Sequence, residues 1–209
     1  MGIANVIGSG SSGNAIIYDK KILVDCGVSF KALQPYLKEI KIVLLTHKHS
    51  DHLNLRTLQI LQSHRPTLRI ACCSWLVEEL PNLKNIDVLE IGKLYDYGDF
   101  RISPVKAYHD VPNCGWRIFK DDKKIFHITD TAHLKGITAK GYDLYAIEHN
   151  YDEMKVQEAQ EESQRYGTFT HAFGSERTHL SWQQARAFIR ANAHENSQVL
   201  ELHKSSMFY

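Results

Sequence analysis

The heptapeptide Thr-His-Lys-His-Ser-Asp-His, residues 46–52, constrains this chain more than any other stretch of its sequence. It directly follows Ile42–Leu45, a continuous apolar run whose length suits a strand buried on both faces. Imidazole and carboxylate groups are ligands that zinc, manganese and iron take in proteins, and no cysteine lies within the motif. The segment therefore predicts a metal site at the end of a buried strand.

The motif offers two pairs of ligands. Residues two apart in an extended chain point to the same side, so His47 and His49 can bind one ion together. After the chain turns, Asp51 and His52 can face a second ion. Two ions need more than these four ligands, so we expect further histidines and a bridging carboxylate. The candidates stand at the ends of later predicted strands, where the sites of open sheets are usually built: His109, Asp130 and His203.

Length and charge bound the class of protein. At 209 residues the chain is long enough for a large core, and we expect a single domain over residues 1–209. Lysine plus arginine (25) nearly balance aspartate plus glutamate (24), so the net charge favours neither nucleic acid nor a membrane surface as a partner. A nucleic-acid substrate would need a local basic patch, for which the candidates are Lys48, Arg117, Lys120, Lys123 and Lys124.

The expected location is the cytoplasm, without membrane association. The N-terminus has no basic region followed by an apolar stretch, and apolar runs of about four residues are far too short to span a bilayer. The cysteines show no CxxC spacing and are interpreted as reduced thiols that pack in the core: Cys26, Cys72, Cys73 and Cys114. Histidines assigned to the surface or to packing are His64, His127, His133, His149, His171 and His194.

Hydrophobic periodicity and turn residues predict a mixed α/β chain. Strands are expected at residues 3–7, 15–18, 22–25, 42–45, 69–72, 88–91, 144–147 and 199–202, and within 94–128. Helices are expected at 29–39, short or broken because of Pro35, and at 53–63, 74–80 and 182–193. The last helix has a capping box, Ser181 with Gln184. The strands come in two groups with helices after each group, which favours two sheets packed face to face with helices outside.

Together these features resemble the metallo-β-lactamase superfamily across nearly the whole chain, because HxHxDH is followed by a lone histidine, a lone aspartate and a late histidine. The closer resemblance is to its WalJ/YycJ-type phosphodiesterase and exonuclease branch. It rests on residues 10–14 (GSSGN), 23–27 (LVDCG), 129–130 (TD), 148–150 (EHN) and 178–181 (THLS). The resemblance implies a four-layer αββα sandwich. Residue 151 is tyrosine where the branch usually has histidine.

Carried over by position, the resemblance implies a site for two divalent ions, zinc or manganese. The ligands would be His47, His49 and His109 for one ion, Asp51, His52 and His203 for the other, and Asp130 between them. Asp25 would steady a ligand, as metal-bound histidines generally require. Two ions about 3.5 to 4 Å apart lower the pKa of a shared water towards ~7, which gives hydrolysis at neutral pH. Asp51 is also a catalytic candidate.

A phosphodiester substrate would need a proton for its leaving alkoxide, and His179 is the candidate general acid. It resembles the late histidine that RNA-processing enzymes of this fold place just before a helix, and here Ser181 caps the next helix. Glu148 would orient and charge its imidazole. The alternative is that His179 only bonds the backbone at the entry to the helix.

Residues 8–13 spell GxGxxG, a pattern that occurs in dinucleotide-binding loops. Here Ala15–Tyr18 follows, which is short and β-branched rather than helical, so we expect a tight turn between strands instead. Ser11, Ser12 and Asn14 are candidate substrate contacts, because hydroxyls and amides of such a turn can reach a phosphate. A turn without any substrate contact is an equal alternative.

The leading functional hypothesis is a binuclear metal-dependent phosphodiesterase or nuclease acting on DNA or RNA. The alternative is a small-molecule hydrolase of the same fold, which cleaves a cyclic phosphodiester, a thioester or a lactam. A third possibility, a metal-stabilised binding module, is disfavoured because a full ligand set with an open water position is typical of catalytic sites.

Overall fold

A computed structural model describes residues 3–167 and 172–205 and divides the chain into two compact units. Unit 1 ends at Glu90 and unit 2 begins at Ile91. Each unit contains one six-stranded sheet with its own helices, so the expected mixed α/β character is confirmed. The single domain over residues 1–209 stays a prediction. His171, one of the histidines assigned to the surface or to packing, lies outside the described residues.

The sheet of unit 1 follows the order of the chain, β1-β2-β3-β4-β5-β6. Its strands are β1 (Ala4–Gly8), β2 (Ala15–Tyr18), β3 (Ile22–Val24), β4 (Ile42–Leu44), β5 (Arg69–Cys73) and β6 (Ile86–Leu89). The first three pair antiparallel through tight turns, as the glycine-rich segment predicted, and β3 to β6 pair parallel. Parallel strands need crossover connections, which here are helical.

Helical segments of unit 1 begin where local residues favour it. They are α1 (Phe30–Leu33), η1 (Gln34–Tyr36), α2 (Leu55–His64) and η2 (Ser74–Glu79). Pro35 lies within η1, directly after α1 has ended at Leu33, so this helix is short and broken as predicted. The side chain of Asn54 accepts a hydrogen bond from the backbone N–H of Thr57 and so caps α2, which therefore begins two residues later than expected. The apolar face of α2 packs on the sheet through Leu58 and Leu61.

The sheet of unit 2 has the order β12-β11-β10-β9-β8-β7. Its strands are β7 (Tyr95–Asp96), β8 (Arg101–Tyr108), β9 (Pro112–Lys120), β10 (Lys123–Ile128), β11 (Leu144–Glu148) and β12 (Gln198–Leu202). Strands β7 to β10 pair antiparallel, and β10, β11 and β12 pair parallel. The parallel strands therefore point their carboxyl ends to one edge of the sheet.

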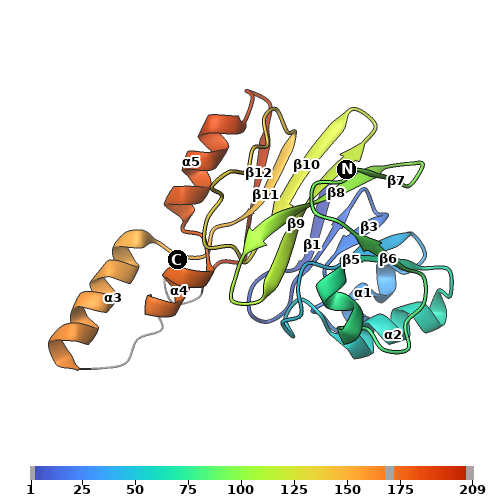
Figure 1. Ribbon diagram of the computed structural model, residues 1–209, viewed down its shortest axis with the longest axis horizontal. Coiled ribbons are helices and arrows are strands. Elements are labelled where there is room, and N and C mark those ends of the chain that lie inside the picture. The colour runs from blue at the N-terminus through green and yellow to red at the C-terminus, as the bar shows by residue number, and fades with distance from the viewer. Residues whose placement is uncertain (1–2, 168–171, 206–209) are drawn as a thin grey trace. The chain divides into compact units, whose positions relative to one another are not determined.

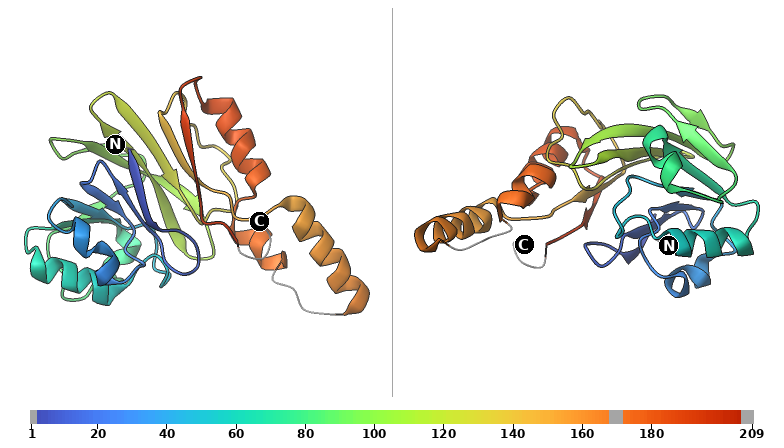
Figure 2. Two further views of the ribbon diagram at one scale, coloured as in Figure 1. Left: turned by 180° about the vertical axis from the view of Figure 1, so that it is seen from behind. Right: turned by 60° about the horizontal axis from the view of Figure 1, so that its bottom comes forward.

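Three helices belong to unit 2: α3 (Glu153–Tyr166), α4 (Ala172–Thr178) and α5 (Trp182–Asn192). The predicted capping box of α5 is present, and Ala185 and Phe188 pack with Phe126 and Tyr145 of the sheet. Figures 1 and 2 show α5 alongside β11 and β12, whereas α3 projects away from that sheet. None of the described helices is both long and apolar enough to cross a membrane.

Helices α3 and α4 were missing from the expectations. In α3 only Val156 and Ser163 are buried, so the segment has no apolar stripe of helical period. The end signals were nevertheless present in the sequence: the side chain of Asp152 accepts a hydrogen bond from Met154 N, and Gly167 ends the helix at φ 64°. Asp152 therefore has a capping role.

Candidate metal centre

The first cluster of candidate ligands lies in unit 1, directly after β4. Burial of Ile42, Val43 and Leu44 fixes this strand in the middle of the sheet, and the chain remains buried through His47. The Nε2 atom of His47 lies 3.2 Å from Nδ1 of His49, so the two imidazoles converge as the spacing predicted. The structure thus brings these two predicted ligands together.

Asp25 organises this cluster from beneath. Its Oδ1 accepts hydrogen bonds from the backbone N–H and the hydroxyl of Thr46, both at 2.9 Å. Its Oδ2 lies 2.7 Å from Nδ1 of His52, and both side chains are almost completely buried. Because a carboxylate accepts hydrogen bonds, Nδ1 carries the hydrogen, and Nε2 keeps its lone pair as an acceptor or ligand atom. This is the arrangement that orients a metal-binding histidine.

Asp51 and His52 also lie close together, with Oδ2 of Asp51 3.5 Å from Nε2 of His52. Main-chain hydrogen bonds join the loop that carries them to two other segments: Asn14 N, in the turn before β2, donates to Asp51 O (2.6 Å), and Cys26 N, after β3, donates to His52 O (2.8 Å). At Gly27 an added Cβ would stand 1.8 Å from the carbonyl oxygen of Asp51. Only glycine allows this close approach of the two backbones.

The glycine-rich turn meets this cluster through Asn14. Its Nδ2 lies 2.9 Å from Nε2 of His52 and 3.0 Å from Gly10 O, and its Oδ1 accepts from Gly10 N at 2.8 Å. Asn14 is therefore engaged within unit 1, and a substrate would have to replace some of these contacts. Ser11 and Ser12 are exposed at the tip of the turn, where their hydroxyls are accessible.

The second cluster lies in unit 2, at the carboxyl ends of its parallel strands. Asp130 follows β10 and is almost fully buried. Its Oδ1 lies 3.4 Å from Nε2 of His203, 3.5 Å from Nδ1 of His179 and 3.9 Å from Nε2 of His109. The structure therefore brings these three predicted histidines around one carboxylate.

Neighbouring side chains hold these ligand candidates in position. The Nδ2 of Asn113 donates to the carbonyl oxygen of Asp130 at 2.7 Å, and that of Asn150 donates to the carbonyl oxygen of His203 at 2.9 Å. The Nδ1 of His109 lies 2.8 Å from the carbonyl oxygen of Thr178. A carbonyl only accepts, so Nδ1 carries the hydrogen, and Nε2 is the nitrogen that lies 3.1 Å from Oδ1 of Asp110 and 3.9 Å from Oδ1 of Asp130.

Glu148 and His179 form the shortest side-chain pair in this cluster, with 2.6 Å between Oε1 and Nδ1. The other oxygen, Oε2, accepts hydrogen bonds from the backbone N–H groups of Thr131 (3.1 Å) and Leu180 (3.2 Å). Donor atoms of Asp130, Glu148, His179 and His203 all lie within 4.8 Å of one another. Since both oxygens of Glu148 already accept hydrogen bonds, we interpret Glu148 as the partner of His179 rather than as a ligand.

The charges of this pair stabilise each other. Burial lowers the pKa of His179, but the charge of Glu148 and the hydrogen bond to it outweigh this effect, and the pKa is raised above its usual value. Burial raises the pKa of Glu148, but the charge of His179 and its hydrogen bond bring it below the usual value. The imidazolium and the carboxylate are thus favoured together. Burial lowers the pKa of His109, partly opposed by Asp130, which favours a neutral imidazole there.

Three residues of the two clusters have left-handed backbone conformations. The φ angles are 59° at Asp25, 54° at Asp130 and 50° at His203. Such conformations are uncommon for residues other than glycine and cluster at functional sites. In each case this backbone conformation sets the direction of the side chain just after the end of a strand.

The comparison with known proteins identifies the family. A family model described as a β-lactamase superfamily domain matches residues 20–202. The chain belongs to this superfamily. A crystal structure of the metallo-β-lactamase fold protein YhfI from Bacillus subtilis is similar, with a TM-score of 0.77 at 18% identity, over 99% of this chain and 88% of that one. The short form of human tRNase Z has a TM-score of 0.67 at 17% identity, over 97% and 93%. The predicted metallo-β-lactamase fold is confirmed.

Curated relatives of this superfamily member include exodeoxyribonuclease WalJ of Streptococcus pneumoniae, 32% identical, and exodeoxyribonuclease YycJ of Bacillus anthracis, 27% identical. Each match covers 71% of this chain and 62% of the relative, so the chain spans less than two thirds of the length of these relatives. The resemblance to the WalJ/YycJ branch is thereby confirmed. The names of these relatives are those of enzymes, in agreement with the expected hydrolase class.

The donor set of this superfamily member fits divalent metal ions. Each cluster offers imidazole nitrogens and carboxylate oxygens without a thiolate, which suits zinc or manganese. Two of the imidazoles are already oriented by hydrogen bonds, His52 by Asp25 and His109 by the carbonyl of Thr178. Orientation of this kind is what a metal-binding histidine requires.

Several supporting residues escaped sequence reasoning. Thr46 stands inside the motif, yet its bonds to Asp25 depend on how β3 and β4 pair. Asn113 and Asn150 act through backbone carbonyls that lie far from them in the sequence, and a lone asparagine gives no local signal of this. Tyr151, the departure from the branch pattern, is buried, and burial raises its pKa to about 12. It packs with Val156 of α3.

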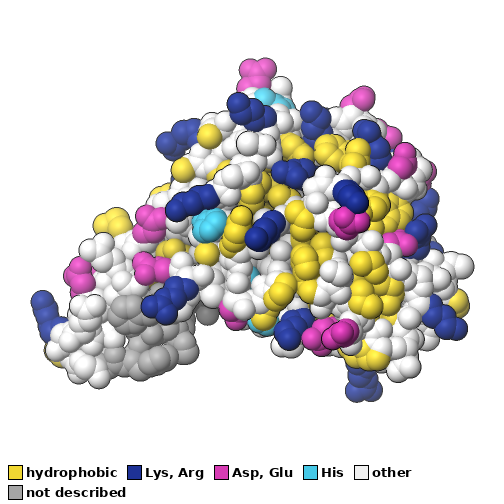
Figure 3. All heavy atoms as spheres, viewed as in Figure 1, with side chains coloured by type: hydrophobic (Ala, Val, Ile, Leu, Met, Phe, Trp, Pro, Cys, Tyr) yellow, Lys and Arg dark blue, Asp and Glu magenta, His cyan; other side chains and the backbone are white. Residues whose placement is uncertain are grey.

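The predicted basic patch carries less free charge than the sequence suggested. Lys120 pairs with Asp121 at 2.6 Å and Lys123 with Asp143 at 2.9 Å. Lys48 pairs with Glu79 at 3.5 Å. On the face that Figure 3 shows, basic and acidic side chains are interspersed rather than segregated. Local neutralisation therefore matches the near-zero net charge.

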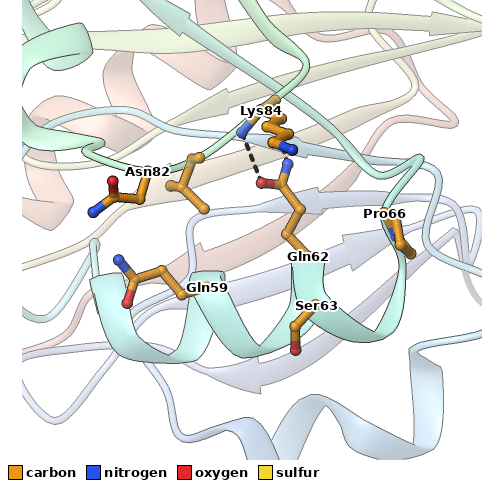
Figure 4. A pocket seen from close by; sticks show the side chains of 7 residues that line it. Gln59, Gln62, Ser63, Pro66, Asn82 and Lys84 are labelled. Carbon is orange, nitrogen blue, oxygen red and sulfur yellow. Dashed lines mark hydrogen bonds between the residues drawn. The ribbon is translucent and has the colours of Figure 1, made fainter.

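A cavity of about 280 Å³ lies beside the second half of α2, lined by Gln59, Gln62, Ser63, Pro66, Asn82, Leu83 and Lys84. Figure 4 shows the amide of Gln62 turned toward the backbone of Lys84. It accepts from Lys84 N at 2.7 Å and donates to Lys84 O at 2.6 Å. The amide therefore fastens the loop before β6 to the helix, and none of the predicted site residues lines this cavity.

Proposed function

We propose that this chain is a binuclear metal-dependent phosphodiesterase that acts on nucleic acid. The observation that carries the proposal is the Glu148–His179 pair, 2.6 Å apart, beside the ligand candidates Asp130 and His203. Hydrolysis of a phosphodiester needs a proton for the departing alkoxide, and a charged imidazole held next to the reacting centre can supply it.

The proposed ligands are those expected from the sequence. One ion would be held by His47, His49 and His109, the other by Asp51, His52 and His203, and Asp130 would be shared. Divalent ions at these positions would make water nucleophilic near neutral pH and neutralise charge on the reacting phosphate. Zinc and manganese both suit such ligands.

His179 is proposed as the general acid. Its Nδ1–H donates to Glu148, so in the imidazolium the Nε2–H is the proton available to a leaving oxygen. Glu148 keeps the ring in this orientation, because two backbone N–H groups fix its second oxygen. Asp51 is proposed to be a metal ligand and also to act next to the reacting phosphate.

DNA is the first substrate to test, because two curated relatives are named exodeoxyribonucleases. Ser11 and Ser12, exposed on the turn before β2, are proposed to contact a substrate phosphate. A small phosphodiester is the second candidate, favoured by the ion pairs of Lys120 and Lys123, which leave less positive charge for a long polyanion. A cytoplasmic location stays a prediction.

The test is an activity panel with the metal-loaded protein. End-labelled single- and double-stranded DNA and RNA would be incubated beside bis-p-nitrophenyl phosphate and a β-lactam. We expect hydrolysis of a nucleic acid and of the phosphodiester. Hydrolysis of the β-lactam alone would overturn the proposal.

The number of metal ions is tested separately by elemental analysis, which should find two ions per chain. A content of no more than one ion per chain in the presence of excess metal would rule out the binuclear assignment.

The variant His179→Ala tests the general acid. Removing a positioned proton donor typically slows turnover about 10²- to 10⁴-fold, so kcat should fall by this order while metal content is unchanged. The matched control is His64→Ala, an exposed histidine at the end of α2, which should keep the wild-type rate. An unchanged rate for His179→Ala would remove this residue from the mechanism.

A further inference from the structure

A second cavity lies in unit 2, between α5 and the edge strand β12. It encloses about 350 Å³ and is lined by His149, Arg186, Ile189, Arg190, Val199 and Glu201. Residue 149 directly follows Glu148, and successive residues of an extended chain point to opposite faces. This cavity is therefore separate from the candidate metal centre, and nothing in the proposed function uses it.

The floor of the cavity presents an unsatisfied hydrogen-bond acceptor. His149 is 1% exposed, and its Nδ1 lies 3.1 Å from the carbonyl oxygen of Ile147. The carbonyl can only accept, so Nδ1 carries the hydrogen, and burial lowers the pKa of this histidine, which favours the neutral ring. Nε2 is then an acceptor, and among the described residues it has no hydrogen-bond partner; Oε1 of Glu201, at 3.9 Å, is beyond hydrogen-bond distance. A buried acceptor of this kind calls for a donor.

The rim of the cavity is positive. Arg186 and Arg190 are one turn apart on α5, so their guanidinium groups emerge on the same side of the helix. Arg186 lies over the ring of Trp182 at 4.8 Å and is 3.9 Å from Glu201, whose carboxylate is already held by Lys204 at 2.6 Å. For Arg190, no ion pair or hydrogen bond occurs within the described residues. Paired guanidinium groups are typical of phosphate recognition.

The walls between floor and rim are apolar. Ile189 comes from α5, and Val199, 45% exposed, comes from β12. An aliphatic pair of this kind suits the flat face of a ring system. A cavity of about 350 Å³ lies at the small end of the range for ligand pockets, which fits a single small molecule.

We propose that this cavity binds one nucleotide, with an N–H group of the base on His149, the ring between Ile189 and Val199, and the phosphate on Arg186 and Arg190. The nucleotide is either a free mononucleotide or one residue of a nucleic-acid strand. Both sources share the three features that the cavity matches: a donor, a flat ring and an anion. The inference does not depend on the proposed hydrolysis, because the cavity shares no residue with the metal ligands.

Binding is tested by calorimetric titration of the intact chain in EDTA, which prevents metal-dependent hydrolysis. The probes are AMP, adenosine, inorganic phosphate and a five-residue oligoadenylate. AMP should bind at least about tenfold more tightly than adenosine, because charge-assisted bonds to two arginines are lost without the phosphate. Purine riboside 5′-phosphate, which lacks the exocyclic amine, should bind about five- to tenfold more weakly than AMP.

Variants locate the binding. Arg186→Gln with Arg190→Gln should weaken AMP binding at least about tenfold. Arg56→Gln with Arg165→Gln removes the same charge from two other exposed helical positions and should leave binding unchanged. Circular dichroism shows whether each double variant is folded.

Equal binding of phosphate and AMP, equal effects of the two double variants, or no binding of any probe would each overturn the proposal. Tighter binding of AMP than of the oligoadenylate identifies the free nucleotide, and the reverse identifies the strand. Nuclease activity measured separately with metal distinguishes failure here from failure of the proposed function.

Discussion

At the scale of single residues, two buried carboxylates organise the two clusters of candidate ligands, one in each unit. Asp25 accepts hydrogen bonds from Thr46 and His52, and Glu148 accepts from His179 and two backbone N–H groups. Each carboxylate affects its cluster without binding a metal itself, because its hydrogen bond to Nδ1 of a histidine leaves Nε2 as the nitrogen available for chemistry. The two carboxylates can be tested independently.

Asp25→Asn is expected to weaken metal binding about 10- to 100-fold. An amide has a single acceptor oxygen, so it cannot satisfy Thr46 and Nδ1 of His52 together. Competition titration with a chromogenic chelator measures the affinity. Asp122→Asn, at an exposed position of the β9–β10 turn, is the control and should bind metal as the wild type does. Equal affinity of both variants would contradict this role for Asp25.

The Glu148–His179 pair should make stability depend on pH. The pKa of His179 is raised, so its contribution is fully present below the usual value of about 6.5 and is lost as pH rises through the raised pKa. The pKa of Glu148 is lowered, so its contribution is present above its usual value of 4.5 and is lost as pH falls through the lowered pKa. The pair therefore stabilises most in mildly acidic solution.

Thermal unfolding in EDTA checks this dependence. The difference in Tm between wild type and His179→Gln should be largest near about pH 5.5 and should shrink towards about pH 9. His64→Gln, on the surface of unit 1, gives the baseline for replacing an exposed histidine. A difference in Tm that does not vary with pH would argue against a charged pair.

At the scale of elements, the loops between strands carry the candidate ligands, and they depend on close backbone contacts. The loop after β3 and the loop after β4 meet at Gly27. Beside it, the backbone N–H of Asn14 donates to Asp51 O and that of Cys26 donates to His52 O. The glycine therefore allows the first cluster to form rather than only turning the chain.

Gly27→Ala should destabilise unit 1 by about 3 kcal/mol or more, because its Cβ would stand 1.8 Å from a carbonyl oxygen that cannot withdraw without moving Asp51. Gly174→Ala is the control: this glycine is in α4 with open space around its Cβ position, and the change should stabilise by about 0.5 to 1 kcal/mol. Urea unfolding measures both. Similar midpoints for the two variants would contradict the close-approach argument.

Elements with a strong local pattern were predictable from the sequence. Strand β4 and helix α5 have continuous or periodic apolar residues, and both formed where expected. Helix α3 was not predicted because its stability comes from its caps and from Val156, not from an apolar stripe. The candidate ligands were recognisable because their residue types recur at strand ends, whereas Asn113 and Asn150 gain their roles only from tertiary hydrogen bonds.

At the scale of the whole molecule, metal should act as a stabilising ligand. A ligand that binds only the folded chain adds about 2.7 kcal/mol when its concentration is 100 times its Kd, so Tm should rise by several degrees in excess zinc or manganese. Differential scanning fluorimetry with and without EDTA measures the shift. Asp130→Ala, which removes the proposed shared ligand, should abolish most of it. An unchanged Tm of the wild type on addition of metal would contradict the ligand assignment.

The left-handed backbone at Asp25, Asp130 and His203 has an evolutionary consequence. Glycine adopts this conformation without steric cost and asparagine adopts it more readily than most residues, so mutation toward either would relieve local strain. The same mutations would remove the carboxylate or the imidazole. Mutations that improve folding at these three positions would therefore remove side chains that the proposed metal site requires, and a chain that keeps its acids and histidine there is less stable than one with glycine or asparagine.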